Sequence, residues 1–541
     1  MKIRRIGGLT AAIAVSALAL AACSSSPSAT TTTTTAASGP TTGIVTVNGS
    51  EPQNPLIPTN TNETGGGKLL TLLFAGLVYY DAKGAPHNEV ADSITTTDAT
   101  TYTIKLKSGW KFTNGEAVTS KSFVDAWNYG AKLSNKQLSS YFFEGIQGFS
   151  YDADSDLTGL KIVDDSTFTV TLKQPEADFP LRLGYSAFYP LPSVAFKDMT
   201  AYGQDPIGDG PYMFKDASAW EHNVKADVVP NPGYIGDRKP MNGGVSVKFY
   251  TSQDAAYQDL LANNLDVDDA IPDSAFGVYK TDLGDRAVNQ PAAIFQSFTI
   301  PQNLPHFTGE EGNLRRQAIS LSIDRKTITD KIFQGTRTPA KDFTSPVIAG
   351  YNPNLTGSDV LDFNATKAKD LWAQANAISP WSGKFTIGYN ADGGHQAWVD
   401  AVANSIKNTL GIDAEGSPYP TFKDLRTDIT KRTIKGAFRT GWQADYPSLY
   451  NFLGPIYGTG AGSNDGDYSN PQVDALLKQG LAAKSVDAAN KYFDQVQEIL
   501  FKDLPAIPLW YSNVTGGYAT TVTNVQFGWD SVPLYYQIKK A

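Results

Sequence analysis

A single cysteine limits how this chain can be stabilised. Cys23 is the only cysteine in 541 residues, and one thiol cannot form a disulfide within the chain. Stability must therefore come from hydrophobic cores, and a length of roughly 500 residues is enough for two or three of them. Aromatic residues make up 11% of the sequence, a share compatible with an aromatic-lined ligand cleft.

The residues before Cys23 have the pattern of an export signal. Residues 2–5 carry three basic side chains, and residues 6–22 are uncharged and mostly apolar or small. The segment Leu20-Ala21-Ala22-Cys23 resembles a bacterial lipobox, whose cysteine receives a diacylglycerol and becomes the new N-terminus. We therefore expect residues 1–22 to be a lipoprotein signal peptide and Cys23 to be the lipidation site. The alternatives are an ordinary cleaved signal and a lone buried cysteine, which the position at a signal boundary disfavours.

The segment after Cys23 has the composition of a spacer. Residues 24–42 contain only Ser, Thr, Pro, Ala and Gly, so we expect residues 23–43 to be a disordered tether. No other stretch of about 18 or more apolar residues exists, so a lipid would be the only attachment to the outer face of the cell membrane. Loss of residues 1–22 would change the formal net charge from −9 to −12. An acidic chain without a basic block is poorly suited to binding nucleic acid.

Two kinds of periodicity divide the rest of the chain. Residues 102–106 and 168–172 alternate as half-buried strands do, and residues 120–133 between them have the pattern of an amphipathic helix. Beyond about residue 310, predicted helices and strands alternate, at 364–375, 385–389, 396–410 and 436–440. Repeated units of this kind indicate an α/β lobe with an open sheet, preceded by a β-rich region.

Four segments, in order, resemble one protein family, the large family 5 solute-binding proteins of ABC importers for oligopeptides, dipeptides and nickel. The segments are Gly109-Trp110-Lys111-Phe112-Thr113-Asn114-Gly115, Gly208-Asp209-Gly210-Pro211-Tyr212, residues 314–325, and Leu504-Pro505-Ala506-Ile507-Pro508-Leu509-Trp510. The resemblance implies an α/β, two-lobed periplasmic-binding-protein-like fold with an extra β-rich domain in the first lobe. It also implies a monomer without a cofactor.

The same resemblance implies domain boundaries. The first lobe would comprise residues 44–75, 198–294 and 512–541, with the β-rich domain at residues 76–197 inserted into it. The second lobe would comprise residues 295–511. The chain would then cross between the lobes near residues 295 and 512.

The predicted strand at residues 436–440 leads into the strongest candidate binding segment. Open α/β sheets bind ligands beyond the carboxyl ends of their strands, and Gly441-Trp442-Gln443-Ala444-Asp445-Tyr446 begins there. The segment resembles the Gly-Trp-x-x-Asp motif of peptide-binding relatives. The resemblance implies that Asp445 pairs with the ligand's α-ammonium and that the backbone of the motif pairs with the ligand's main chain. The alternative is that Asp445 only starts a turn before Tyr446.

Four further residues are candidates by resemblance. Arg439 lies where some relatives bind the C-terminal carboxylate of a peptide. An ion pair at the surface or within the lobe is an equal alternative role for Arg439. Asn62 and Glu63 are interchangeable matches to a loop that holds the peptide backbone from the first lobe. Tyr141 resembles a cleft-facing tyrosine, with core packing as its alternative.

The sequence gives little support to a catalytic or metal-binding function. The sequence contains no nucleophile elbow, phosphate-binding loop or zinc-protease motif, and its four histidines lack metal-ligand spacing. The acidic run Asp266, Asp268 and Asp269 does not fit an EF-hand, and we expect it to be a solvated edge.

We therefore expect a receptor, and not an enzyme, that captures short peptides between two lobes and delivers them to an ABC transporter permease. The alternatives are an oligosaccharide or chelated nickel as the solute, and a role as a peptide-signal receptor.

Overall fold

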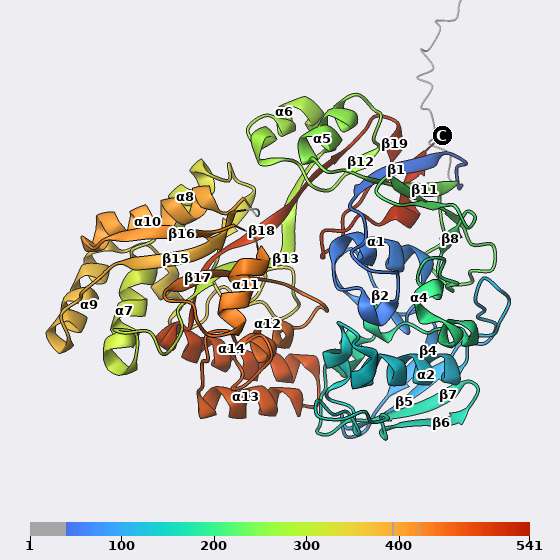
Figure 1. Cartoon of the computed structure of the whole chain (residues 1–541), viewed down its shortest axis with the longest axis horizontal. Helices are drawn as coiled ribbons and strands as arrows, with labels where there is room; N and C mark the ends of the chain where they lie inside the picture. Colours follow the sequence, from blue (N-terminus) through green and yellow to red (C-terminus); the bar gives the residue numbers. More distant parts are fainter. Residues whose placement is uncertain (1–38, 392–393, 421, 541) are drawn as a thin grey trace, which may run out of the picture. The chain divides into compact units, whose positions relative to one another are not determined.

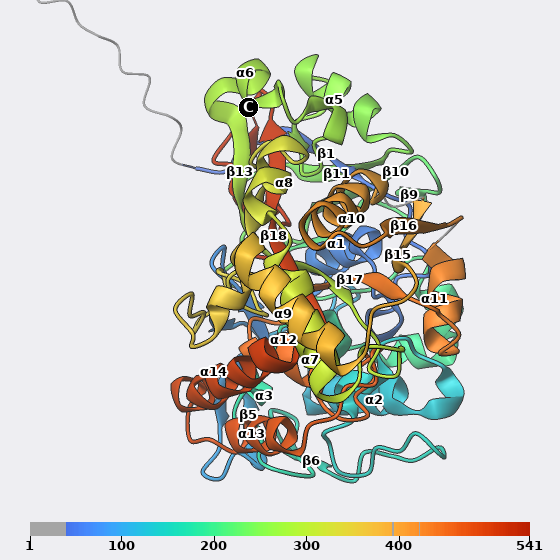
Figure 2. The ribbon, with the colours of Figure 1, turned by 90° about the vertical axis from the view of Figure 1, so that its left-hand side faces the viewer.

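Two long antiparallel strands, β13 (Ala287–Thr299) and β18 (Ala506–Tyr518), form the centre of the molecule. The computed structural model describes residues 39–391, 394–420 and 422–540, so Cys23 lies outside the described residues. Figure 1 shows the two strands running between two groups of elements, and Figure 2 shows them side by side from another direction. Both predicted crossings, near residues 295 and 512, fall within these strands.

The central sheet joins both groups. Its strand order is β16-β15-β17-β13-β18-β12-β1-β11-β10-β8, with β14 paired to β18 and β9 to β10. The other strands of this sheet are β1 (Ile44–Gly49), β8 (Tyr212–Phe214), β9 (Trp220–Glu221), β10 (Lys225–Pro230), β11 (Gly244–Phe249), β12 (Val267–Asp268), β14 (Arg337–Pro339), β15 (Phe385–Asn390), β16 (Ala414–Tyr419) and β17 (Ala437–Gln443).

Helices cover the sheet on both sides of the central strands. Those of the first group are α1 (Thr64–Leu73), α4 (Met199–Tyr202), α5 (Gln253–Leu261) and α6 (Tyr279–Leu283). Those of the second group are α7 (Gly309–Leu321), α8 (Arg325–Lys331), α9 (Ala365–Ile378), α10 (Gln396–Leu410), α11 (Phe422–Thr430), α12 (Leu449–Tyr457), α13 (Pro471–Leu481) and α14 (Val486–Asp503). The predicted alternation of helices and strands after residue 310 is confirmed.

A separate four-stranded sheet forms the β-rich region. Its order is β4-β5-β7-β6, and every neighbouring pair is antiparallel. The elements of this region are β2 (Val78–Tyr80), β3 (Pro86–Asn88), β4 (Ala91–Thr95), β5 (Thr101–Leu106), β6 (Leu160–Asp164), β7 (Thr167–Thr171), α2 (Ser120–Ala131) and α3 (Phe179–Arg182); near the C-terminus β19 (Val522–Thr523) pairs with β20 (Lys539–Lys540). A capping box between Thr119 and Ser122 starts α2, whose apolar face is buried as its pattern predicts.

Two large hydrophobic cores and one small cluster stabilise the described residues. One large core contains side chains of β1, α1 and the β-rich region, and the other contains those of α7–α10, α12–α14, α5 and α6. The small cluster joins Leu425 and Ile429 of α11 to Phe438 of β17. In β13, Ala292 belongs to the first core and Ala293 to the second, so the central strands separate the two. Two cores in one chain without a disulfide agree with the expectation from its length.

The acidic run at residues 266–269 is buried, so the prediction of a solvated edge is wrong. Asp266 and Asp268 have no exposed surface. Asp266 accepts a hydrogen bond from the Thr46 backbone at 2.7 Å and pairs with Lys540 at 2.6 Å. Asp269 pairs with Lys68 at 2.6 Å. These partners are far away in the sequence, so local pattern could not reveal them.

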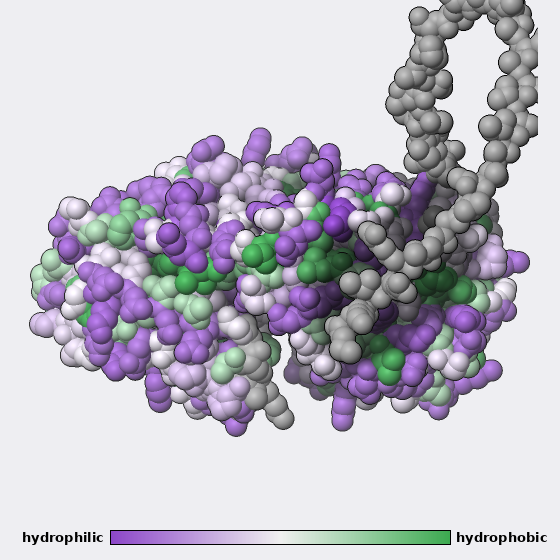
Figure 3. Space-filling view, turned by 90° about the horizontal axis from the view of Figure 1, so that it is seen from above, coloured by the Kyte–Doolittle hydropathy of each residue, from purple (hydrophilic) through white to green (hydrophobic). Residues whose placement is uncertain are grey.

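No helix in the described part of the chain is long and apolar enough to cross a membrane. Figure 3 shows that hydrophilic side chains cover most of the visible face, with hydrophobic residues gathered toward its middle.

A buried ion network fixes the β-rich region to the segment after β17. Arg182 lies 2.7 Å from Glu176 and 2.8 Å from Asp178, and all three side chains are at most 11% exposed. Ser448, at the start of α12, donates to Asp178 at 3.2 Å. The guanidinium also lies 5.4 Å from the ring centroid of Tyr446. Removing one member of such a network leaves charges buried without a partner.

Arg182→Met should therefore lower the free energy of unfolding by about 3–5 kcal/mol. Urea unfolding of the ligand-free protein measures this loss. The matched control is the triple variant Arg182→Met, Glu176→Gln, Asp178→Asn, which removes the charges together and should recover most of the stability. A single variant as stable as the wild type would contradict the account.

Candidate functional site

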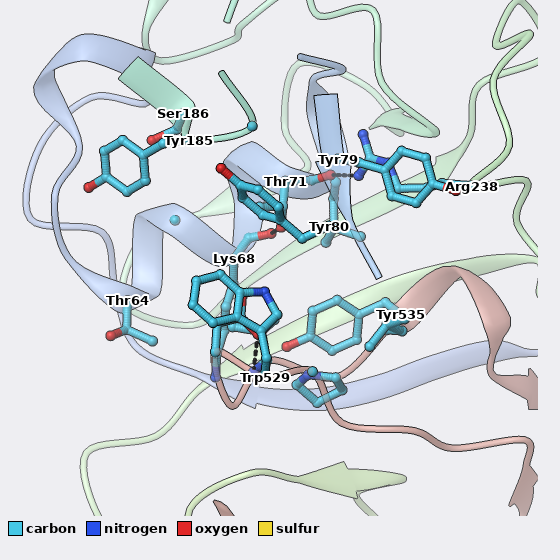
Figure 4. A pocket seen from close by; sticks show the side chains of 18 of the residues that line it. Thr64, Lys68, Thr71, Tyr79, Tyr80, Tyr185, Ser186, Arg238, Trp529 and Tyr535 are labelled. Atoms are coloured by element: carbon cyan, nitrogen blue, oxygen red, sulfur yellow. Dashed lines mark hydrogen bonds between the residues drawn. The ribbon is translucent and has the colours of Figure 1, made fainter. Parts of the chain in front are cut away.

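A cavity of 370 Å³ brings together segments that are far apart in the sequence. It is lined by the start of α1, by β2 and its following turn, by residues 184–189, by the end of β17 and by residues 528–536. Figure 4 shows the rings of Tyr79, Tyr80, Tyr185, Trp529 and Tyr535 around it. The aromatic-lined cleft expected from composition is present.

Asp445 is a carboxylate in the wall of this cavity without a cationic partner. Burial raises its pKa to about 6, although a hydrogen bond from Asn451 acts in the opposite direction. That bond, from Asn451 Nδ2 to Asp445 Oδ2, is 3.1 Å long. No lysine, arginine or histidine among the described residues lies within ion-pair distance of Asp445. A partly buried carboxylate of this kind favours a cationic ligand group.

Asn451, in the first turn of α12, holds the whole binding segment. Its Oδ1 accepts hydrogen bonds from the Asp445 backbone N–H at 3.0 Å and from Trp442 Nε1 at 2.9 Å. One amide side chain thereby fixes both the tryptophan and the aspartate of the Gly-Trp-x-x-Asp motif. Asn451 lies outside the motif, so its role could not be predicted from the sequence.

The strand β17 continues through Gln443, so the expectation that it ends at Thr440 is wrong. Pairing with the long strand β13 extends it, and Gln443 lies opposite Ile294. On the other edge, β15 pairs only with Ala437 and Phe438. Within the described residues, no strand pairs with that edge from Thr440 to Gln443. This edge can therefore accept an extended chain.

A bulge in β13 positions two segments that line the cavity. The pairing of β13 with β18 is irregular between Pro291 and Ile294. There, the Ala293 carbonyl accepts from the Ala444 N–H at 3.0 Å, and the Ala293 N–H donates to the Trp529 carbonyl at 2.8 Å. The bulge thus holds the residue before Asp445 and the segment around Trp529 on the same short stretch of strand.

Asn62 and Glu63 both line the cavity, but in different ways. Glu63 is the N-cap of α1 and accepts a hydrogen bond from the Gly66 N–H at 2.8 Å. The Asn62 side chain is exposed. Asn62 is therefore the more available of the two to a ligand, a distinction that the sequence left open.

Tyr141 lies near the cavity without lining it. Its side chain is 41% exposed, so the alternative that it packs in the core is wrong. Its ring contacts Phe142, with 4.5 Å between centroids, and Phe142 stacks on Tyr185 of the cavity wall. Surrounding protein atoms, and then the charge of Asp445, raise the pKa of Tyr141. Because a large part of the Tyr141 side chain is exposed, a ligand can reach it.

Arg439, Gly441 and Trp442 line a second cavity of 210 Å³ in the second group of elements. Arg439 Nε donates to Asn390 at 2.9 Å, and its guanidinium lies 4.8 Å from the Phe422 ring centroid. Of the predicted site residues, only Asn62, Glu63, Gln443, Ala444 and Asp445 line the first cavity. Tyr446 is buried beside Arg182 and lines neither cavity among the described residues.

Burial of Asp445 should destabilise the ligand-free protein. Its pKa rises from 3.8 to about 6, so the folded state binds a proton more readily than the unfolded state. Stability from this group therefore falls as the pH rises from about 4 to 6, by roughly 3 kcal/mol in all. Asp445→Asn removes the charge and keeps an oxygen for Asn451.

Thermal unfolding without ligand should thus show Asp445→Asn to be more stable than the wild type at pH 8 and equal to it at pH 4. A variant that is less stable at pH 8, or a difference independent of pH, would refute the assigned burial.

Comparison with known proteins identifies the family. The family model described as bacterial extracellular solute-binding proteins, family 5 Middle, matches residues 85–464. The periplasmic murein peptide-binding protein MppA of Escherichia coli K12 is 27% identical over 465 residues, which are 82% of this chain and 82% of that protein.

Two solved structures share the fold. MppA in an unliganded open form superposes with a TM-score of 0.78 at 23% identity, over 93% of this chain and 99% of that one. Haemophilus influenzae OppA in complex with RPPGFSPFR gives a TM-score of 0.73 at 22% identity, over 92% and 99%. The relatives are solute-binding proteins and not enzymes. This chain therefore belongs to the family 5 bacterial extracellular solute-binding proteins and has their two-lobed α/β fold.

Proposed function

We propose that the protein captures short peptides in the cavity beside Asp445 and delivers them to an ABC transporter permease. A lipid on Cys23 would hold it at the outer face of the cell membrane. The observation that carries the proposal is the Asp445 carboxylate, which is held by Asn451 and lacks a cation among the described residues. A peptide's α-ammonium would supply that cation.

The main chain of the peptide would pair with the protein on two sides. The unpaired edge of β17, from Thr440 to Gln443, would accept it as an added strand. Asn62, on the opposite wall, would donate to or accept from its amides. Because these contacts use backbone and termini, the side chains of the peptide would project into space and ordered water, and varied sequences would bind.

The names of the relatives support a peptide over the alternatives. One is called a murein peptide-binding protein, and another was solved with the peptide RPPGFSPFR. A neutral oligosaccharide would leave Asp445 buried without a counter-charge, which is unfavourable. Chelated nickel is another outcome of the binding test below, whereas a role in peptide signalling would involve the same binding with a different consequence.

Asp445→Asn should weaken binding of peptides with a free amino group by about 2–5 kcal/mol, because a buried charge pair loses one member. That is roughly a thirtyfold to several-thousandfold rise in Kd. Calorimetry with alanine peptides of three to six residues, free and N-acetylated, measures the coupling. Acetylated peptides should bind the wild type poorly and lose little more in the variant.

The matched control is Asp81→Asn. Asp81 also lines the cavity, but it is partly exposed and lies 3.3 Å from His87. Its loss should change binding little. Equal affinity of the wild type for free and acetylated peptides would end the assignment of Asp445 and favour a sugar or chelate.

Cys23→Ala should abolish lipid attachment, because the thiol is the acceptor. The wild type should enter the membrane fraction with the intact mass of a lipidated chain that starts at Cys23. The variant should remain an unprocessed precursor or be released. A wild-type protein that starts elsewhere and carries no lipid would disprove the anchor.

A further inference from the structure

The first cavity contains more negative charge than one peptide ammonium can neutralise. Its described lining residues include four carboxylates, Glu63, Asp81, Asp445 and Asp530, and two bases, Lys68 and Arg238. Each base already pairs with a carboxylate other than Asp445 and Asp530. The Lys68 ammonium lies 2.6 Å from Asp269, and the Arg238 guanidinium lies 2.7 Å from Glu89.

Two of the four carboxylates already have roles. Glu63 caps α1, and Asp81 lies beside His87 at the rim. Asp445 is assigned above to the ammonium of the peptide. Asp530 forms no ion pair with any of the described residues.

Asp530 is held in place and still has a free oxygen. Its Oδ1 accepts a hydrogen bond from the Val532 N–H at 3.1 Å. Its Oδ2 receives no hydrogen bond or ion pair from the described residues. Burial is the main cause that raises the pKa of Asp530 to about 6, although backbone hydrogen bonds and the charge of Lys68 act in the opposite direction. The environment therefore disfavours its charge unless a cation arrives.

The two carboxylates share one side of the cavity. The bulge at Ala293 binds both Ala444 and Trp529, the residues just before Asp445 and Asp530. Gln443 Nε2 also donates to the Asp530 carbonyl at 3.3 Å. Burial is the main cause that raises the pKa of the Tyr80 hydroxyl, and the charges of both Asp445 and Asp530 add to it. A ligand that reaches Asp445 is therefore also close to Asp530.

A buried hydroxyl in the same wall lacks a partner. Tyr535 is 3% exposed, and its hydroxyl has no hydrogen bond within the described residues. Figure 4 shows this hydroxyl directed toward Trp529, inside the ring of aromatic side chains. Buried polar groups are rarely left unpaired, so the hydroxyl points to a ligand atom. Aromatic faces around a cavity also attract cations.

We propose that the cavity selects peptides carrying a second cationic group close to their α-ammonium, and that Asp530 and Tyr535 bind this group. The second group would be a side-chain amine or guanidinium of one of the first residues. Its cation would approach Asp530 Oδ2, and the Tyr535 hydroxyl would accept a hydrogen bond from it. The inference rests on the proposed function, because Asp445 must hold the α-ammonium.

Calorimetry with paired tripeptides tests the proposal. Lysine is placed at the first, second or third position of an otherwise alanine peptide, and norleucine, which has a similar length without a charge, replaces it in the partner peptide. At one position at least, the wild type should bind the lysine peptide ten times more tightly or better. Asp530→Asn should abolish this preference and change the Kd of norleucine peptides by less than about threefold.

Two variants serve as controls. Asp81→Asn removes an equal charge from the same cavity and should keep the preference for lysine. Tyr535→Phe should reduce the preference without removing it. Asparagine at position 530 can still accept from Val532, and the thermal unfolding of Asp530→Asn should show that it folds.

The outcomes separate this inference from the proposed function. Equal binding of lysine and norleucine peptides to the wild type at all three positions overturns the inference. So does an Asp530→Asn variant that weakens both peptides alike. If the norleucine peptides bind and depend on Asp445, the proposed function survives that result. If no peptide of either series binds the wild type, both fall.

Discussion

The rest of the site depends on a partly buried carboxylate that has no counter-charge among the described residues. Asp445 is kept there by Asn451, which binds its carboxylate, its backbone N–H and the indole of Trp442. Such a group destabilises the empty protein and favours a cationic ligand, so recognition and stability oppose one another at this position. The two large hydrophobic cores and the long central strands offset the stability that Asp445 removes from the empty protein.

The bulge in β13 holds the two segments that carry the candidate binding carboxylates. Regular pairing of β13 with β18 would leave Ala293 engaged within the ladder. The irregularity frees its N–H and carbonyl to hold the Trp529 and Ala444 segments, which carry Asp530 and Asp445. Because β13 also separates the two cores, the site lies where a change in the relation between the lobes would act on both carboxylates.

Local pattern predicted much of the fold and one part of the site. The limits of α10 follow from its amphipathic pattern and from Gly411, whose positive φ ends the helix. Asp445 was recognisable from its motif. Asp530 was not, because it lies 87 positions beyond Gln443 and only the tertiary fold brings them together. Asp266 looked solvated for the same reason, since its partner Lys540 is distant in sequence.

Proton release on binding tests the central claim most directly. Burial raises the pKa of Asp445 to about 6, so near pH 6 some of these side chains are protonated in the empty protein, whereas an incoming ammonium requires the ionised form. Calorimetry at pH 6, in two buffers of different ionisation enthalpy, should therefore show net proton release when an alanine peptide binds. Asp445→Asn should release clearly fewer protons than the wild type. Binding without proton release in the wild type, or equal release in the variant, would contradict the account.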